Sequence, residues 1–177
     1  IGLYRNHAIE RNSKNFKKYG MWYYQMNSLG FNYRISDINC ALGISQLSQI
    51  NKFIKKRRFI AKEYFKIFNG NNNLKLPIEN DETYHSYHLF PLLVNFQKTK
   101  ITKKKLFRKL SSKKIFLQVH YIPIHLQPYY KRKYNFKIGD FPVAEKFYKQ
   151  QISLPIYNNL DNKKIEWIGK QIKNLLF

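Results

Sequence analysis

Residues 30–47 read GFNYRISDINCALGISQL, and the interpretation of the chain depends on this stretch. Gly30, Asn32 and Arg34 stand immediately before a pattern that predicts a helix capped by Ser36. An ordinary helix start needs only the cap. The extra amide can be a turn former, because asparagine is comfortable in turns. Alternatively, the amide, the backbone N–H groups and the guanidinium form a binding site for an anion such as phosphate.

The helical pattern continues well beyond this motif. Apolar residues recur at helical spacing from Ser36 to about Phe68, and Gly70 with the asparagines after it ends the pattern. The spacing predicts one helix of roughly 30 residues or more, about 45 Å long. A helix of this length is too long for one small core, so we expect it to bridge two lobes. Cys40 falls inside the pattern, and we expect it to be a small core residue rather than a nucleophile.

The rest of the chain alternates strand and helix patterns. We expect strands over 87–96 and 115–121, helices over 102–112 and 141–150, and a last helix, with Thr102, Asp140 and Asp161 as the three helix caps. A short apolar segment over 152–154 precedes Pro155. Strands alternating with helices predict a small α/β lobe behind the long helix.

Length and composition narrow the class of protein. The chain has 177 residues, long enough for a real core, and its 44% apolar content argues against general disorder. Its single cysteine excludes an internal disulfide and fits a reducing compartment. The sequence has no apolar run of the roughly 18 residues that a membrane-spanning helix needs. These features predict a globular protein that does not span a membrane.

The chain is strongly basic, with 33 Lys and Arg against 10 Asp and Glu. Such an excess can indicate nucleic-acid binding. Here the positive residues are scattered in short runs, and lysine, asparagine and isoleucine are all abundant, as in proteins from AT-rich genomes. We therefore attribute most of the charge to compositional drift. Attraction of a phosphorylated small ligand and binding of nucleic acid stay open as alternatives.

Residues 118–130, QVHYIPIHLQPYY, are the second candidate site. Imidazoles, phenols and amides gather there at a predicted strand exit, where loops often hold ligand-binding groups. Tyrosine hydroxyls and imidazoles suit sugar hydroxyls and pyrophosphate oxygens, and flat rings stack on a base or a sugar. The alternative is that the aromatic rings only pack the lobe. The histidine spacings match no metal motif, so we expect no metal site.

Five segments carry a resemblance to a known family. RNHAIERN, LGFNYRISDINCALGISQL, HSYHLFPL, LQVHYIPIHLQPYY and GDFPVAEKFYKQQISLPIY follow one another in the order seen in the DegT/DnrJ/StrS sugar aminotransferases. The resemblance runs from about Arg5 to the last helix. It implies an α/β fold, the C-terminal part of a fold-type-I aminotransferase that depends on pyridoxal 5'-phosphate. Residues 1–50 would end the large cofactor-binding domain and start the long linking helix, and 51–177 would form the small α/β domain.

The resemblance also implies an activity. Such enzymes are homodimers with active sites shared between subunits. They move an amino group from L-glutamate to a nucleotide-linked keto sugar, with the cofactor as electron sink. VHYIPIHLQPYY (119–130) together with GDFPVAE (139–145) is similar to the branch that acts on a UDP-linked 4-keto-6-deoxy amino sugar in pseudaminic acid synthesis, in the cytoplasm. A perosamine- or bacillosamine-type enzyme, a basic nucleic-acid-binding module, and a lysine-lacking regulator remain alternatives.

Site residues follow from the resemblance position by position. Asn32 matches the asparagine that reaches the cofactor phosphate of the neighbouring subunit, and Arg34 would support the same region. The residues matching the sugar-nucleotide contacts are Gln118, Val119, His120, Tyr121 and His125. None of the lysines present stands in the context of the Schiff-base lysine, which the family places upstream. We therefore expect a C-terminal portion that does not catalyse transamination alone. Position 8 is alanine where the family usually has glycine.

Overall fold

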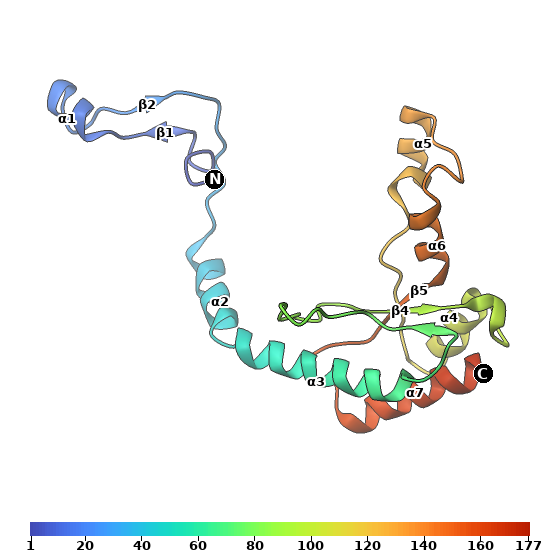
Figure 1. The fold of residues 1–177 in the computed structure, drawn as a ribbon. Coiled ribbons are helices and arrows are strands. Elements are labelled where there is room, and N and C mark those ends of the chain that lie inside the picture. The colour runs from blue at the N-terminus through green and yellow to red at the C-terminus, as the bar shows by residue number, and fades with distance from the viewer. The chain divides into compact units, whose positions relative to one another are not determined.

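The computed structural model describes residues 1–177, the whole chain, which divides into two compact units (Figure 1). Unit 1, Ile1–Ile50, contains β1 (Ile9–Glu10), α1 (Ser13–Tyr19), β2 (Gln25–Met26) and α2 (Asp37–Leu47). Unit 2, Asn51–Phe177, contains α3 (Ile50–Phe68, which begins one residue earlier), β3 (Leu74–Lys75), β4 (Phe90–Val94), α4 (Lys103–Ser111), α5 (Pro128–Tyr134), α6 (Pro142–Gln150), β5 (Gln151–Leu154) and α7 (Asn162–Leu176). Short 3-10 turns lie at Phe96–Lys98 and Ile124–Leu126. The assignment of the two units to a large and a small domain stays a prediction.

Unit 1 has little core of its own. Strands β1 and β2 pair antiparallel, with Ile9 opposite Met26. Ala8 is the one buried apolar residue in this unit. Helix α2 contains no buried residue, so the expectation that Cys40 belongs to a core is wrong; Cys40 is half-buried. The apolar spacing that we assigned to a core-facing stripe is therefore exposed over α2.

The single long helix expected from Ser36 to Phe68 is also wrong, because the structure has two helices there. Helix α2 ends at Leu47 and α3 begins at Ile50. The Ser48 hydroxyl donates to the Ser45 carbonyl at 2.8 Å, and the Gln49 N–H donates to the Gln46 carbonyl, three residues back. Serine side chains compete in this way with the backbone ladder. The tighter turn interrupts the regular helix between the units.

Unit 2 is built on a three-stranded antiparallel sheet in the order β3-β4-β5. Phe90 pairs with Leu154 and Leu74 pairs with Val94, so β4 is central. It lies within the strand expected over 87–96 but is shorter. Pro91 is tolerated in β4 because β3 pairs only with Leu93 and Val94, which leaves that side of Pro91 unpaired.

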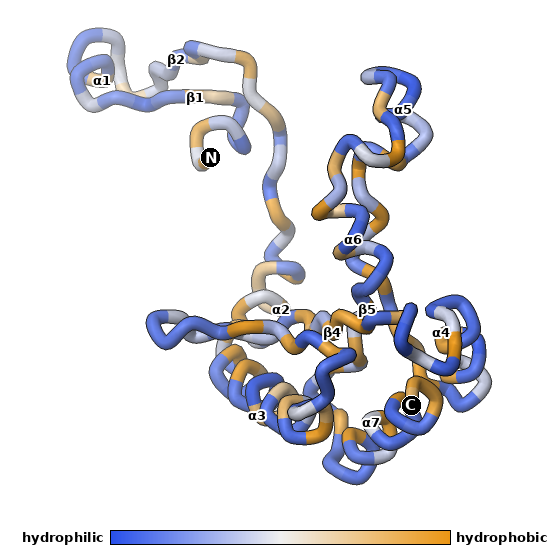
Figure 2. The backbone as a smooth tube through the Cα atoms, turned by 45° about the vertical axis from the view of Figure 1, so that its right-hand side comes forward, coloured by the Kyte–Doolittle hydropathy of each residue, from blue (hydrophilic) through white to orange (hydrophobic).

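Helices α3 and α7 lie on the same side of this sheet (Figure 1). Figure 2 shows hydrophobic and hydrophilic residues alternating along both, as expected for helices with one core-facing side. Their buried side chains join those of β4, β5 and α4 in one core; the largest are Ile60, Tyr64, Phe68, Phe90, Leu92, Leu106, Leu110, Ile152, Ile165, Ile172 and Leu176. This core fixes β5, which the second candidate site depends on.

The expected helix ends are confirmed in three places and corrected in one. Thr102 and Asp161 cap α4 and α7, with their side chains accepting from the N–H groups three residues on, and Gly70 after α3 has φ 77°. Asp140 does not cap α6: Phe141 is the cap residue, and the Asp140 carboxylate accepts from the Lys137 N–H at 2.7 Å instead. No helix is long and apolar enough to cross a bilayer.

The strand expected over 115–121 is wrong. Only Gln118 pairs, through an isolated bridge to Ser153 of β5. The next available N–H group, that of His120, donates to the side chain of Gln151 at 3.0 Å rather than to a strand backbone, so the ladder does not continue. Helix α5 was not expected from the sequence, where 128–134 was interpreted as part of a loop.

Candidate functional site

The GFNYR motif in unit 1 is held against residues 4–8 by backbone contacts. The His7 N–H donates to the Phe31 carbonyl at 2.9 Å, and the Phe31 N–H donates to the Tyr4 carbonyl at 2.7 Å. A β-carbon on Gly30 would lie 2.2 Å from the Ala8 nitrogen and 2.4 Å from the His7 carbonyl carbon. Only glycine allows the two segments to approach this closely.

Residues 7 and 8 adopt an unusual backbone conformation next to Gly30. His7 has φ 60° and Ala8 has φ 52°, in the left-handed region that favours glycine. The position where the resemblance leads us to expect glycine is therefore one where glycine has a physical advantage. Ala8 keeps the same turn with a small, fully buried side chain.

Arg34 of the motif lines an open polar hollow in unit 1 together with residues of the N-terminal segment. The Arg34 Nη2 donates to the Asn6 Oδ1 at 3.0 Å, and Asn6 pairs with Asn32 through a β-bridge. The hollow, of about 420 Å³, is lined by Gly2, Arg5, Asn6, Arg34, Ile35 and Cys40. Its lining residues include two arginines and an asparagine but no aspartate or glutamate, a set of donors that fits a phosphate. Asn32 is exposed beside the hollow but does not line it.

The second candidate site, residues 118–121 in unit 2, is anchored to β5. His120 Nδ1 lies 2.8 Å from the Ser153 Oγ, and the Gln151 Nε2 donates to the same oxygen at 2.6 Å. Gln151 and Ser153 are both buried, whereas Gln118 and Tyr121 are exposed and His120 is half-buried. The network therefore holds the His120 ring through its Nδ1. The other ring nitrogen, Nε2, makes no hydrogen bond within the chain and can bind a ligand.

Gln151 and Ser153 are functional candidates that the sequence reasoning missed. Both are polar residues in a short strand whose other members, Ile152 and Leu154, belong to the core. Buried polar side chains need partners, and these two find them in His120. The alternation of polar and apolar residues in QISL was a signal for this arrangement, although it does not indicate which residue they bind.

The surroundings of Tyr121 differ from those of His125: Tyr121 is exposed beside a hollow, whereas His125 is buried. Tyr121 is one of the residues around an open apolar hollow of about 700 Å³, with Ile122, Pro123, Ile124, Asp140, Phe141, Pro142, Val143, Ala144 and Phe147. His125 is only 6% exposed, and its Nε2 lies 3.0 Å from the Glu145 Oε1. The structure thus gives His125 a partner within the chain, and its contact with a substrate stays a prediction.

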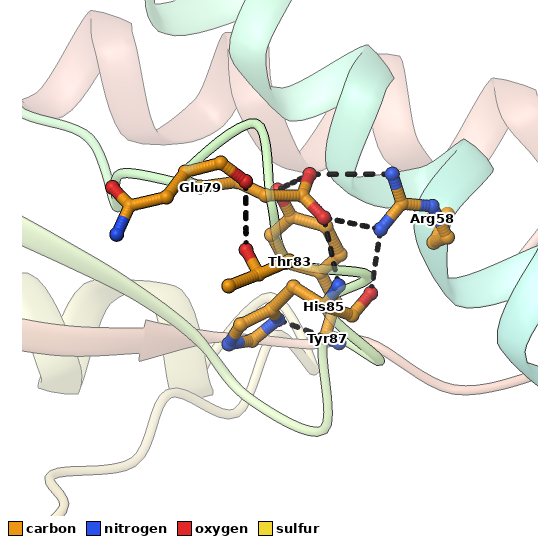
Figure 3. Close-up of polar contacts among 6 residues, drawn as sticks. Arg58, Glu79, Thr83, His85 and Tyr87 are labelled. Carbon is orange, nitrogen blue, oxygen red and sulfur yellow. Dashed lines mark hydrogen bonds and ion pairs between the residues drawn. The ribbon is translucent and has the colours of Figure 1, made fainter.

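A third polar cluster holds the loop before β4 against α3 (Figure 3). The Glu79 carboxylate accepts from the Arg58 guanidinium, from the His85 N–H at 2.7 Å and from the Tyr87 hydroxyl at 2.9 Å. The hydrogen bond from Arg58 and then that from His85 lower the Glu79 pKa to about 2. The Arg58 guanidinium also lies over the Tyr84 ring, 4.2 Å from its centroid. The HSYHLFPL segment is therefore explained in part by these structural contacts.

The predicted site residues thus fall into two groups that belong to different units. Asn32 and Arg34 lie together in unit 1, and Gln118, His120 and Tyr121 lie together in unit 2. Val119, which lies between Gln118 and His120 in the sequence, is half-buried. The first group offers cationic and amide donors for an anion. The second offers an oriented imidazole and an exposed phenol, which suit a sugar or a base.

The fold agrees with comparisons to known proteins; the assignment of the two residue groups to binding sites stays a prediction. The family model described as DegT/DnrJ/EryC1/StrS aminotransferase family matches residues 1–173. The chain belongs to this family. The predicted family and the predicted fold class are therefore confirmed. The chain has part of the fold of a fold-type-I aminotransferase.

Individual relatives cover nearly all of this chain. The uncharacterized protein MJ1066 of Methanocaldococcus jannaschii is 35% identical over 99% of it. The UDP-4-amino-4,6-dideoxy-N-acetyl-beta-L-altrosamine transaminase of Campylobacter jejuni is 32% identical, also over 99%. The solved structure of Helicobacter pylori PseC, an aminotransferase of pseudoaminic acid biosynthesis, superimposes with a TM-score of 0.81 at 29% identity over 99% of the chain. The chain spans 44–46% of the length of these three proteins.

Proposed function

We propose that this chain is part of an enzyme that uses pyridoxal 5'-phosphate to transfer an amino group from L-glutamate to a nucleotide-linked keto sugar. Family membership supports the reaction class. The polar hollow beside Asn32 is the observation that supports the cofactor most directly, because its donor set is cationic and contains no acid. An open site with two guanidinium groups attracts a dianion such as the cofactor phosphate.

Each residue of the motif has a distinct task in this proposal. Arg34 is held by Asn6, so its guanidinium is already oriented when the phosphate arrives. Asn32 has an exposed amide that donates to a phosphate oxygen, which we place in the active site of a second copy, as the resemblance implies. Gly30 lets the backbone of the motif lie flat against residues 7 and 8. When bound, the cofactor supplies the electron sink for the amino transfer.

We place the sugar nucleotide against residues 118–121. Ser153 and Gln151 orient the His120 ring before a ligand binds. The Nε2 atom can therefore bind a sugar hydroxyl or a phosphate oxygen with little further loss of side-chain entropy. Tyr121, which is 73% exposed, offers a ring face for stacking and a hydroxyl for hydrogen bonding. The substrate we propose is a UDP-linked 4-keto-6-deoxy amino sugar, supported by the 32% identity to the altrosamine transaminase.

Retention of the cofactor tests the proposal. In the full-length protein, Asn32→Ala should weaken binding of pyridoxal 5'-phosphate by about 1–3 kcal/mol, the cost of one lost charge-assisted hydrogen bond. The measurement is the visible absorbance of the bound cofactor after dialysis against a series of cofactor concentrations. The control Asn15→Ala removes a half-buried asparagine of the same unit, whose amide donates to the Gln25 side chain, and should leave retention unchanged.

Two outcomes would contradict the proposal. Equal cofactor affinity in Asn32→Ala and in the unaltered protein would remove the role of the motif in phosphate binding. A full-length protein that is colourless in the presence of the cofactor, or whose visible absorbance does not change on adding glutamate, would contradict the proposed reaction. The sugar is tested separately: a UDP-linked keto sugar should accept the amino group faster than a GDP-linked one, and the reverse would favour the perosamine-type alternative.

A further inference from the structure

Residues 120–125 in unit 2 are fixed at both ends by buried polar contacts. At one end His120 contacts Ser153 of β5 at 2.8 Å, as described above. At the other end the His125 Nε2 lies 3.0 Å from the Glu145 Oε1 on α6. The residues between the two histidines, among them Tyr121, are largely exposed. The position of the exposed part therefore depends on the two buried ends.

Glu145 is the acceptor that holds the second end. Its Oε1 accepts from the Gly139 N–H at 2.7 Å as well as from His125, and only 5% of the residue is exposed. The Gly139 N–H and then His125 lower the Glu145 pKa, so the carboxylate stays charged at neutral pH. The His125 ring is enclosed by aromatic rings, with centroids 4.7 Å away at Phe141 and 6.4 Å away at Phe136. Because a buried carboxylate needs hydrogen-bond donors to offset its lost hydration, removing any one of its few donors destabilises it.

These contacts connect the two sides of the apolar hollow. One side is formed by residues 121–124, which directly precede His125, and the other by residues 140–144, which directly precede Glu145. The Gly139 N–H ties the turn before the second side to the same carboxylate oxygen. One hydrogen-bonded pair thus sets the separation of both sides, in a region that lies outside the main core cluster.

We infer that His125 is a positioning residue, which holds Tyr121 and its neighbours in place for the nucleotide sugar through Glu145 without itself contacting the substrate. This inference rests on the proposed function. Without His125, the Glu145 carboxylate would lose its side-chain donor and draw in water or turn outward. Residues 121–124 would then sample several positions, and the substrate would have to order them on binding.

Kinetics of the full-length protein test this role. His125→Leu introduces an apolar side chain of moderate size and removes the donor. It should raise KM for the UDP-linked sugar about tenfold while leaving KM for L-glutamate unchanged. His125→Gln keeps an amide that can donate to Glu145 and should recover most of the lost affinity. His88→Leu makes the same change at an exposed histidine and should match the unaltered protein.

Hydrogen exchange provides a readout that does not depend on activity. The Gly139 amide should exchange faster in His125→Leu than in the unaltered protein and near normally in His125→Gln, because it donates to the same oxygen as His125. The inference would be overturned if Gly139 exchanged faster in His125→Leu but KM for the sugar did not change, or if both KM values rose equally.

The proposed function fails separately, if the unaltered protein takes no amino group from glutamate. In that case the exchange measurement still tests the role of His125: unchanged Gly139 exchange in His125→Leu would overturn the inference.

Discussion

The two units of the chain hold their candidate ligand groups in different ways. All buried apolar residues except Ala8 belong to Asn51–Phe177, where they form one core between the sheet and its helices. In Ile1–Ile50 large apolar side chains are instead exposed, with Met21, Leu29 and Ile38 each more than 80% accessible. His120 is therefore positioned by a packed core, whereas Asn32 and Arg34 are positioned by backbone hydrogen bonds and a close glycine contact.

This difference explains where each unit tolerates change. A core responds to volume, because an emptied space loses contacts on every side. A backbone-paired loop responds to any atom that keeps the two segments apart, and is nearly indifferent to exposed side chains. The conformation of the motif in unit 1 should thus depend on a few positions in the chain, whereas the stability of unit 2 should depend on many.

The largest effect that tests this comparison is expected for a matched pair of leucines. Leu92→Ala empties space in the core of unit 2 and should lower the free energy of unfolding by about 2–5 kcal/mol. Leu42→Ala makes the same change in α2, where the side chain is 60% exposed, and should cost less than about 1 kcal/mol. Urea unfolding followed by circular dichroism measures both. Similar losses would mean that α2 is packed as tightly as the core.

The next effect concerns the glycine contact. Gly30→Ala should destabilise the pairing of the motif with residues 4–8 by about 2 kcal/mol, because the added carbon overlaps the Ala8 backbone. Amide exchange at His7 and Phe31 measures the opening. Gly43→Ala is the control: it adds a carbon in open space within α2, where alanine should stabilise the helix by up to ~1 kcal/mol. Protected His7 and Phe31 amides in Gly30→Ala would show that backbone proximity does not hold the motif.

Local patterns in the sequence were sufficient for much of unit 2. The helices at Thr102 and Asp161 follow from a cap residue and a following apolar stripe, both encoded within a few neighbouring residues. The break after Leu47 was not predicted because the apolar spacing continues through it. The turn is evident only from the structure, in the Ser48 hydroxyl contact and in the hydrogen bond from the Gln49 N–H to the Gln46 carbonyl. Periodicity reports which residues share a face; it does not report whether the backbone ladder is continuous.

The candidate sites show the same limit more sharply. Asn32, Arg34 and His120 were selected as candidate donors from residue type and from the family resemblance, and their roles stay a prediction. Their supports were not, because Asn6 lies 28 residues from Arg34 and Ser153 lies 33 residues from His120. Such contacts arise from the tertiary fold, and no local pattern encodes them.

The smallest effect is expected at Glu79, where a partly exposed ion pair supports the loop before β4. Because the folded-state pKa of Glu79 is lowered from 4.5 to about 2, its stabilisation is fully present above pH 4.5 and is lost as the pH falls toward 2. Glu79→Gln should therefore lower the free energy of unfolding at neutral pH, and the difference from the unaltered protein should shrink over that acid range.

Urea unfolding at a series of pH values measures this dependence. Glu63→Gln is the matched control, because Glu63 pairs only with Lys66 in an i, i+3 surface contact, which contributes little. A Glu79→Gln difference that stays constant between pH 4.5 and 2 would show that the carboxylate charge is not what holds the loop. In that case this loop of unit 2 would be held by backbone contacts, as the motif of unit 1 is. The two units would then differ less than the presence of a buried core in only one of them suggests.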